Sequence, residues 1–545
     1  MRAFSAGPLP RPDTALVTVL LISLVVRVWG LMWGLPSATH YFSYHPDESR
    51  VLEASSVTMN VFTGHLLPHF YNYGSLQLYL VCFANSLAAL FGAIDNVPKE
   101  FALWYPEWAK MYLVGRWLTV GMGVGTVWTV YAIGQRLWGR RAGLIAALTL
   151  AITPLHAQHS HFLTVDVPAT FWAVLSLLWA VRLATEERGS LKSVLWAGVF
   201  AGLAAATKYN LALMILPLIV AFTLRKGPLA PNNGGMRGAV LGLSAFAVAF
   251  LLACPGAVLE SKIFLHDLRF EAVHMQNADD YTFRDTGNGF VYQIRRNLDA
   301  GLGLPLLLLS LISIGYAMTK RERGDVLLAS CALPYFILIG LASIRYARYD
   351  IPLLPILSLW NGRFFANTSC IGRISLRKPA MGICTGILGL TALNCLCLIQ
   401  PMAEIDPRDR AYTWLQTHDS EAAIGFPTMP WFGTVPLSPY FAMPQRGGWR
   451  KAPGIETSPR IDYSGKDWDI TQQPPVIVLS EYDFADALRL QDPAAAQYQE
   501  MLRDHYTVAA SFVRTSLFAR GQRQNLPHDM TYPSPAIYLY QRKTD

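Results

Sequence analysis

Apolar runs long enough to cross a bilayer recur through the first 400 residues of the chain. A helix needs roughly 20 mostly apolar residues to span the hydrocarbon core. The first run, about residues 14–35, is too long for a signal peptide, so we expect an uncleaved spanning helix. Further spans are expected at about 111–135, 142–159, 166–185, 193–207, 210–224, 238–256, 301–318, 326–343, 349–365 and 380–400. The pattern predicts a mainly α, polytopic membrane protein with about eleven spans.

Basic residues in the short loops predict how these spans are oriented. If the spans alternate, one side receives Arg136, Arg140, Arg141, Arg182, Arg188, Lys192, Arg225, Lys226, Arg237, Lys320, Arg321, Arg323, Arg363, Arg373, Arg377 and Lys378. Short loops rich in Lys and Arg are typical of the cytoplasmic side, which also places the N-terminus there. The longer segments 36–110 and 257–300 then form external loops.

One apolar run, Ser75–Ile94, does not fit this alternation. If it spanned, every later loop would change sides and the basic loops would face outward. We therefore predict a helix that lies in the membrane interface, as part of the first external loop.

Composition agrees with a membrane protein. Hydrophobic residues make up 52% of the 545 residues and charged residues only 15%, whereas soluble domains carry about 25% charged residues. This excludes a soluble enzyme, a disordered chain and a fibrous protein. The net charge of +8 reflects the basic loops and does not indicate nucleic-acid binding.

The chain divides at Pro401 into a membrane module, 1–400, and a tail, 401–545. In the tail we expect a helix at Arg408–Gln416 and strands at Ala423–Phe426, Val476–Leu479 and Ala536–Tyr540, hence a small α/β domain outside the membrane. All seven cysteines precede residue 400, so no disulfide framework holds the tail. No phosphate-cradling glycine loop opens it, and we expect no nucleotide cofactor.

Two acidic positions stand at the predicted outer ends of spans. Asp47 and Glu48 follow His45-Pro46 directly after the first span, and Asp166 stands two residues before Pro168. Charges beside hydrocarbon are costly and usually functional. Acidic residues and proline also suit the first turn of a helix, so a purely structural role stays open at both places.

Two basic positions fall on the same predicted face. Lys208 lies where two spans meet, and Arg345 and Arg348 precede another span. Cations at helix ends also snorkel to the interface without any further role. Together, however, these groups suit an amphiphilic anionic substrate, because cations bind a phosphate and a carboxylate takes a proton.

Two other features are better explained without chemistry. His156, His159 and His161 lack the spacing of a metal site, and Gly121-x-Gly123-x-Gly125 lies inside a spanning helix. Glycines in that position favour close helix packing over nucleotide binding.

The order of these motifs resembles family 39 of the C-superfamily of membrane glycosyltransferases, which includes protein O-mannosyltransferases and lipid A aminoarabinose transferases. The resemblance rests on His45-Pro46-Asp47-Glu48, Pro68…Tyr71…Leu76, Arg116, Thr164-Val165-Asp166-Val167-Pro168, Thr207-Lys208 and Arg345-Tyr346. It implies an enzyme that transfers a sugar, with inversion, from a polyprenyl-phosphate donor at the outer face of the membrane.

By this resemblance Asp47 is the general base that deprotonates the acceptor. Glu48 and Asp166 are supporting carboxylates and, with Asp47, candidate ligands of a divalent metal. The candidates for binding the donor phosphate are Lys208, Arg345 and Arg348. Further candidates in the first loop are His45, Tyr71 and Tyr73.

The acceptor stays open between protein, lipid and glycan. Relatives often have a Pro-Pro-Leu run where this chain has Tyr73-Gly74-Ser75-Leu76, and the aminoarabinose transferases have a lysine just before it, where this chain has Asn72. This difference weakens the case for the lipid A reaction.

Two other functions compete with the transferase. A secondary transporter would use the charges as a translocation pathway, but we find no internal repeat and the charges gather at one face. A polytopic assembly protein would use the tail to bind a partner. An uncleaved anchor and a compact tail suit a bacterial inner membrane.

Overall fold

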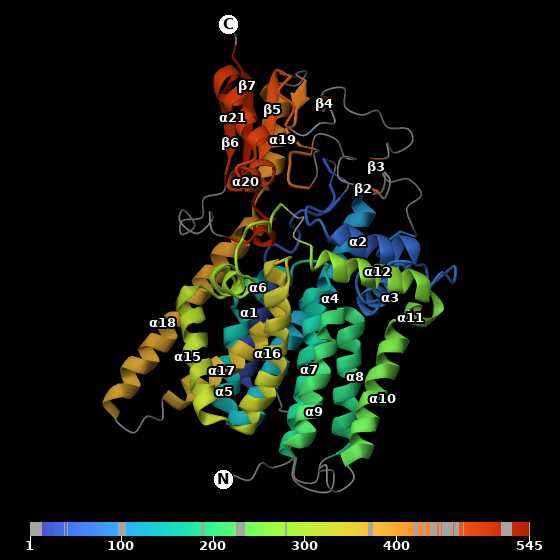
Figure 1. Cartoon of the computed structure of the whole chain (residues 1–545), viewed down its shortest axis with the longest axis vertical. Coiled ribbons are helices and arrows are strands. Elements are labelled where there is room, and N and C mark those ends of the chain that lie inside the picture. The colour runs from blue at the N-terminus through green and yellow to red at the C-terminus, as the bar shows by residue number, and fades with distance from the viewer. Residues whose placement is uncertain are drawn as a thin grey trace.

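The computed structural model describes residues 13–37, 39–40, 42–95, 105–186, 190–224, 235–277, 281–368, 374–418, 423–428, 432–436, 444–445, 448–449, 461–462, 468–471, 473–513 and 526–543. A bundle of long helices carries a small domain with β-strands at one end (Figure 1). The last strand, β7 (Ile537–Arg542), lies within this domain.

Helices account for most of the described residues among the first 400. In the first half they are α1 (Thr14–Val28), α2 (Glu48–Leu52), η1 (Glu53–Thr58), α3 (Leu76–Leu90), α4 (Tyr105–Trp138), α5 (Arg140–Ala151), α6 (Pro154–His159), α7 (Asp166–Thr185), α8 (Leu191–Thr207), η3 (Tyr209–Met214), α9 (Ile215–Thr223) and α10 (Gly235–Ala253). In the second half they are α11 (Gly256–Leu259), α12 (Ser261–His274), α13 (Gly289–Tyr292), η5 (Gln293–Leu298), α14 (Asp299–Leu302), α15 (Leu304–Lys320), α16 (Arg323–Leu341), η6 (Ala347–Leu353), α17 (Leu354–Thr368), α18 (Ile374–Ile399) and η7 (Gln400–Ala403).

Within the described residues, four helices are long and apolar enough to cross a membrane by themselves. They are Tyr105–Trp138, Asp166–Thr185, Arg323–Leu341 and Met381–His418. A fifth span results if Gly289–Leu302 and Leu304–Lys320, bent by 118°, count together. Shorter apolar helices cover other predicted spans, and 142–159 is broken before Pro154 into α5 and α6. The mainly α membrane fold is confirmed, while the count of about eleven spans stays a prediction.

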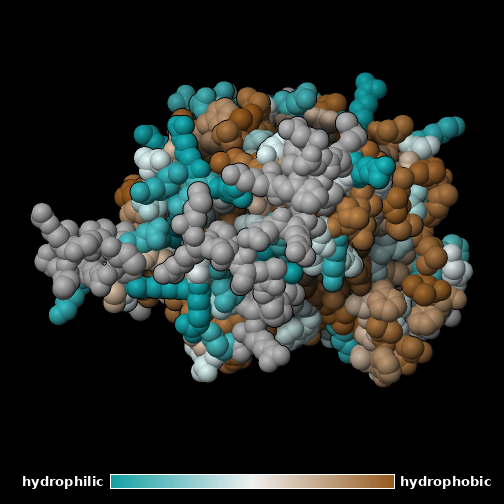
Figure 2. Space-filling model, turned by 90° about the horizontal axis from the view of Figure 1, so that it is seen from below, coloured by the Kyte–Doolittle hydropathy of each residue, from teal (hydrophilic) through white to brown (hydrophobic). Residues whose placement is uncertain are grey.

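The outer surface of the bundle is suited to lipid. Large apolar side chains on α1, α10, α15, α16 and α18 are exposed, among them Val25, Leu252, Ile312, Leu341 and Ile383. Brown, hydrophobic side chains cover much of the flanks when the molecule is seen from below (Figure 2). An apolar surface of this extent marks a membrane or protein contact.

Glycines let the helices of the bundle approach closely. A Cβ on Gly123 of α4 would lie 2.8 Å from Ser160 Oγ, and one on Gly125 would lie 2.7 Å from the Phe171 ring. Gly123 and Gly125 therefore serve close packing, as the sequence predicted, whereas a Cβ on Gly121 would meet no atom within 4 Å.

The first external loop contains the helix predicted for the membrane interface. This helix, α3, has 15 residues and is about 22 Å long, shorter than the roughly 30 Å hydrocarbon core. It lies at the end of the bundle nearest the C-terminal domain and packs against α4 (Figure 1). The interfacial prediction agrees with this position.

The tail folds as an α/β domain, as predicted. Its elements are α19 (Pro407–His418), β1 (Ile424–Gly425), β2 (Pro444–Gln445), β3 (Gly448–Trp449), β4 (Ile461–Asp462), β5 (Val476–Ser480), α20 (Glu481–Arg489), α21 (Pro493–His505), β6 (Tyr506–Phe512), η9 (His528–Met530) and β7 (Ile537–Arg542). The main sheet has the order β4-β1-β5-β7-β6, parallel from β4 to β5 and antiparallel across β7. The sequence missed α20, α21 and β6.

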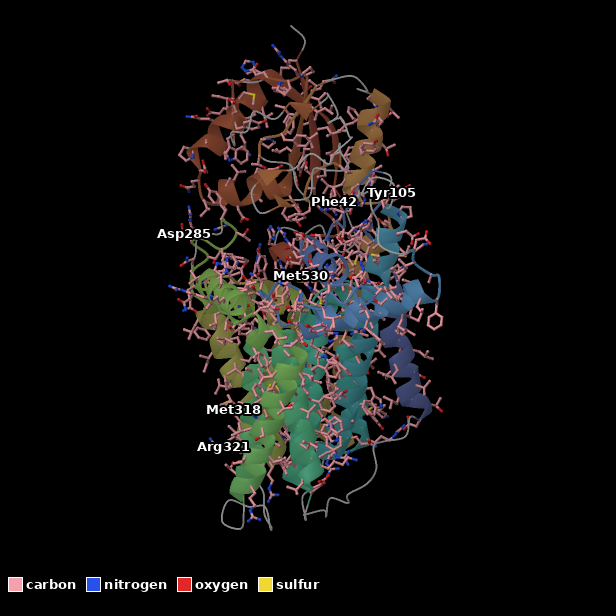
Figure 3. The ribbon with its side chains drawn as sticks, turned by 90° about the vertical axis from the view of Figure 1, so that its right-hand side faces the viewer. Phe42, Tyr105, Asp285, Met318, Arg321 and Met530 are labelled. Atoms are coloured by element: carbon pink, nitrogen blue, oxygen red, sulfur yellow. The ribbon has the colours of Figure 1, made fainter. Side chains whose placement is uncertain are left out.

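The tail also reaches back to the bundle. Met530 lies at the junction between the domain and the helices, whereas Arg321 lies toward the far end of the bundle (Figure 3). The candidate residues that the sequence places on the outer face are therefore expected at this junction.

Candidate functional site

Asp47 stands at the junction, at the start of the short helix α2. Its Oδ2 lies 3.2 Å from Arg348 Nη2, and its side chain is 26% exposed. Arg348 belongs to the 3-10 turn η6, which begins 300 residues further along the chain. The fold thus places a partly accessible carboxylate against an almost buried cation.

His45 supports Asp47 through the backbone. Its Nδ1 accepts a hydrogen bond from the Asp47 N–H at 3.3 Å, and its buried ring packs 4.4 Å from Phe162 and 5.1 Å from Tyr532 between ring centroids. Burial lowers the pKa of His45, which favours the neutral ring. His45 therefore supports the backbone at Asp47.

Asp166 and Lys208 form a second charged pair. Lys208 Nζ donates to Asp166 Oδ1 at 2.6 Å, with only 15% of the Lys208 side chain and 5% of the Asp166 side chain exposed. The ammonium also lies 4.4 Å from the centroid of the Tyr349 ring. Tyr349 follows Arg348 directly, so both ion pairs meet at η6.

Glu48 does not join this group, although it is the neighbour of Asp47. It is fully buried and receives two hydrogen bonds from Arg116, at 2.8 and 2.7 Å. Ser43 Oγ and the Leu163 N–H also donate to it. Burial alone would raise the pKa of Glu48, but Arg116 reverses this and the pKa is lowered. Glu48 is thus a structural anion that joins the first loop to α4.

The proposed metal set does not fit these contacts. Glu48 has both oxygens engaged by Arg116, and Asp166 is paired with Lys208. Across the described parts of the chain, no three His, Cys, Asp or Glu side chains form a group that could hold a metal ion. The prediction of a metal shared by Asp47, Glu48 and Asp166 is therefore not supported by the geometry.

Arg345 also lies apart from Asp47. Its Nη1 donates to Thr286 Oγ1 and to the Gly287 carbonyl, both at 2.8 Å. The side chain thus fastens the second external loop to the start of η6. These contacts do not match the predicted role of Arg345 in binding the donor phosphate, although Arg345 precedes Arg348 by only three residues.

The two tyrosines of the first loop differ in position. Tyr71 is buried, and its hydroxyl donates to Glu260. Burial raises the pKa of Tyr73, the negative charge of Asp47 adds to this rise, and Arg348 opposes it. Tyr73 therefore borders the Asp47 group, whereas Tyr71 joins the first loop to the second.

The structure adds to the candidate site two acidic residues that the sequence did not predict. Glu271 of α12 accepts a 2.7 Å hydrogen bond from Asn72 Nδ2, and burial raises its pKa, with Lys208 and Asp47 among its electrostatic neighbours. Asp529 of η9 accepts hydrogen bonds from the backbone of η6. Neither residue stands in a motif, so no sequence signal marks them.

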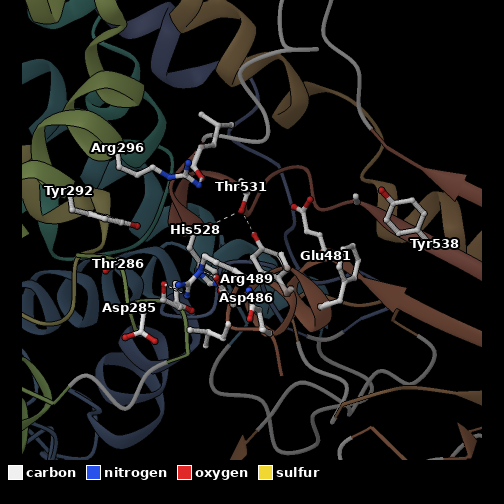
Figure 4. Close-up of a pocket in the computed structure, with 18 of the residues that line it drawn as sticks. Asp285, Thr286, Tyr292, Arg296, Glu481, Asp486, Arg489, His528, Thr531 and Tyr538 are labelled. Carbon is white, nitrogen blue, oxygen red and sulfur yellow. Dashed lines mark hydrogen bonds and ion pairs between the residues drawn. The ribbon is translucent and has the colours of Figure 1, made fainter. Parts of the chain in front are cut away.

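A cavity of about 1010 Å³ opens between the second external loop and the C-terminal domain. Tyr292 and Arg296 line it from one side, and Glu481 and Tyr538 from the other (Figure 4). His528, the neighbour of Asp529, also lines it. The cavity therefore reaches the segment that contacts η6.

Comparison with known proteins finds a family match over part of the chain. Residues 110–252 match the family of dolichyl-phosphate-mannose-protein mannosyltransferases. A curated Bacillus subtilis (strain 168) protein, YycA, is provisionally assigned as a mannosyltransferase. It is 28% identical over 145 residues, which cover 26% of this chain and 21% of that protein.

Solved structures give the fold. ArnT from Cupriavidus metallidurans, in the apo state and bound to undecaprenyl phosphate, matches with a TM-score of 0.50 at 16% identity. The match covers 96% of this chain and 97% of ArnT. The Archaeoglobus fulgidus oligosaccharyltransferase matches at 15% identity with a TM-score of 0.47, over 75% of this chain and 58% of its own. The chain therefore shares the fold of ArnT, and its residues 110–252 match the family of dolichyl-phosphate-mannose-protein mannosyltransferases.

Proposed function

We propose that this protein is an inverting glycosyltransferase that moves a sugar from a polyprenyl-phosphate donor to an acceptor hydroxyl or amine, with Asp47 as general base. The observation that carries the proposal is the pairing of a partly exposed Asp47 with Arg348, beside the Asp166–Lys208 pair. One accessible carboxylate and two cations are the groups that such a transfer needs. The matched family and the undecaprenyl phosphate bound to ArnT support the same donor class.

The proposed sugar transfer uses the Asp47 carboxylate and the nearby cations as follows. The acceptor attacks the anomeric carbon opposite the phosphate, so the configuration inverts, and its proton passes to an Asp47 oxygen. The bond from the anomeric carbon to the phosphate oxygen breaks, and both of its electrons leave with polyprenyl phosphate. A phosphate departs without protonation, which is why one carboxylate suffices, in contrast to the carboxylate pair of glycoside hydrolases.

Arg348 and Lys208 stabilise the departing phosphate in this proposal. A donor phosphate competes with Asp47 for Arg348 Nη2, and the carboxylate that is released becomes more available as a base. Donor binding would then also prepare the base.

The acceptor reaches the site through the cavity beside the second external loop. Its lining combines cations, acids and aromatic rings, among them Arg296, Asp486 and Tyr292. Such a mixed lining suits a polar acceptor, and the acceptor's identity is left to experiment.

We further place the site on the outer side of a bacterial inner membrane, with the N-terminus in the cytoplasm. The site lies at the domain end of the bundle, while Arg321, in a basic loop, lies toward the opposite end (Figure 3). Basic loops favour the cytoplasm.

The test compares purified wild-type protein with Asp47→Asn. Each receives a panel of polyprenyl-phosphate sugars and a membrane extract, and release of polyprenyl phosphate is followed by mass spectrometry. We expect Asp47→Asn to lose about 10²- to 10⁴-fold in rate. Glu53→Gln, an exposed carboxylate six residues away, serves as the control and should retain full activity.

Equal release by wild type and Asp47→Asn would remove Asp47 from the chemistry. No release from any donor would contradict the transferase and favour a transporter, whose substrate flux would then depend on the same charges.

A further inference from the structure

Residues 526–532 of the C-terminal domain contact the candidate site. Gln158 Nε2 of the bundle donates to the Met530 carbonyl at 3.0 Å. On the domain side, Arg408 Nη2 donates to the Tyr532 carbonyl at 2.9 Å. The segment is thus fastened at Met530 and at Tyr532, and Asp529, which directly precedes Met530, is fully buried.

The Asp529 carboxylate caps the turn that carries Arg348. Its two oxygens accept the N–H groups of Ala347 and Arg348 at 3.0 and 2.9 Å. The first N–H groups of a helical turn have no partner within it, and hydrogen bonds to a charged acceptor are stronger than neutral ones. Asp529 therefore fixes where η6 begins.

The same carboxylate faces the Arg348 side chain. Asp529 Oδ2 lies 4.0 Å from Arg348 Nη1 and 4.0 Å from His159 Nε2. Among the described residues, Arg348 Nη1 has no hydrogen-bond partner, while Nη2 lies 3.2 Å from Asp47 Oδ2. The guanidinium therefore lies between a carboxylate from the first loop and one from the C-terminal domain.

We propose that Asp529 is a positioning residue through which the C-terminal domain completes the site. By fixing the backbone of Arg348 and attracting Nη1, it directs Nη2 toward Asp47 and toward the donor phosphate. The statement that Arg348 is directed toward the donor phosphate rests on the proposed function. The coupling of Asp529 to Arg348 is independent of that function.

A double-mutant cycle tests the proposal. Wild type, Asp529→Asn, Arg348→Ala and the double variant are purified in detergent, and the affinity of each for undecaprenyl phosphate is measured. We expect Asp529→Asn to weaken binding about tenfold in the wild-type background and less than twofold when Arg348 is absent. Asp504→Asn, on an exposed residue of the same domain, is the control and should bind as wild type does.

Two results would overturn the proposal: no weakening by Asp529→Asn, or equal weakening in both backgrounds. If none of the proteins binds the lipid, the proposed donor is wrong, and thermal unfolding of the same four proteins decides the coupling. If the changes in melting temperature caused by Asp529→Asn and Arg348→Ala add up in the double variant, the coupling of the two residues is contradicted. Should Asp529→Asn fail to fold, Asp529→Glu, which retains the charge but displaces it, replaces it in the cycle.

Discussion

Glu48 and Arg116 form a fully buried ion pair with two hydrogen bonds between the first external loop and α4. Arg116 also donates to the carbonyls of Leu31 and Trp33, each at 2.7 Å. The pair therefore holds together the end of the first helix, the loop after it and α4, and it sets the frame in which Asp47 is presented.

Glu48→Gln should destabilise the protein strongly. The substitution leaves the Arg116 charge buried and unpaired, which costs about 3–5 kcal/mol. Thermal unfolding in detergent measures the loss. The matched control is Glu53→Gln, which removes a surface pair with Arg50 worth roughly 1 kcal/mol or less. Equal effects of the two substitutions would contradict the structural role of Glu48.

The different roles of Asp47 and Glu48 show what sequence could and could not predict. Both were recognised as candidates because they adjoin a membrane helix. Successive residues of a helix point about 100° apart, so one carboxylate faces the junction and the other faces α4. The partners, Arg348 and Arg116, lie far away in sequence, and only the folded bundle decides which acid meets which cation.

Arg348→Gln should lower the transfer rate about a hundredfold or more, because it removes a donor aimed at the departing phosphate. Arg345→Gln should change it by only a small factor, since Arg345 binds the 286–287 loop. Single-turnover rates with saturating donor compare the two. Equal losses would return Arg345 to the phosphate site.

Lys208 and Asp166 should behave as one unit. Lys208→Met leaves an unpaired buried anion, so it should lower the melting temperature more than the double variant Asp166→Asn/Lys208→Met. Transfer should be lost in both proteins, because each lacks a cation for the phosphate. Additive losses of stability would show that the pair contributes no coupling.

Gly74→Ala should disturb the docking of the first loop. A Cβ there would lie 1.9 Å from the Ala206 carbonyl oxygen, and the Gly74 N–H already donates to the Thr207 carbonyl at 3.2 Å. The backbone must shift, so both melting temperature and activity should fall. Gly121→Ala is the matched control, because a Cβ at that helical position meets no atom within 4 Å and should be neutral or stabilising.

Glu271 should make stability depend on pH. Its pKa is raised by burial, so the folded state favours the protonated acid, and stability falls as pH rises through the values of the unfolded and folded states. Glu271→Gln lacks this dependence. The two proteins should melt together near pH 4, and the variant should be the more stable at pH 7. If the difference in melting temperature between wild type and Glu271→Gln is the same at all pH values, the prediction is wrong.

The mainly helical membrane fold, the tail's first helix and three of its strands could be predicted because each depends on local hydrophobicity and propensity. Glu271 and Asp529 could not be, because nothing near them in sequence distinguishes them from surface acids. Asp529 becomes part of the site because Gln158 and Arg408 hydrogen-bond to the segment 526–532 that carries it.

The place of Asp529 in the sequence has a consequence for biosynthesis. Chains are made from the N-terminus, so Asp47, Asp166 and Arg348 all exist before Asp529 does. A ribosome stalled within the C-terminal domain would leave a bundle whose η6 turn has no carboxylate to cap it. Completion of synthesis and assembly of the site are therefore coupled, and a truncated chain would be distinguishable from a finished one by the geometry of Arg348.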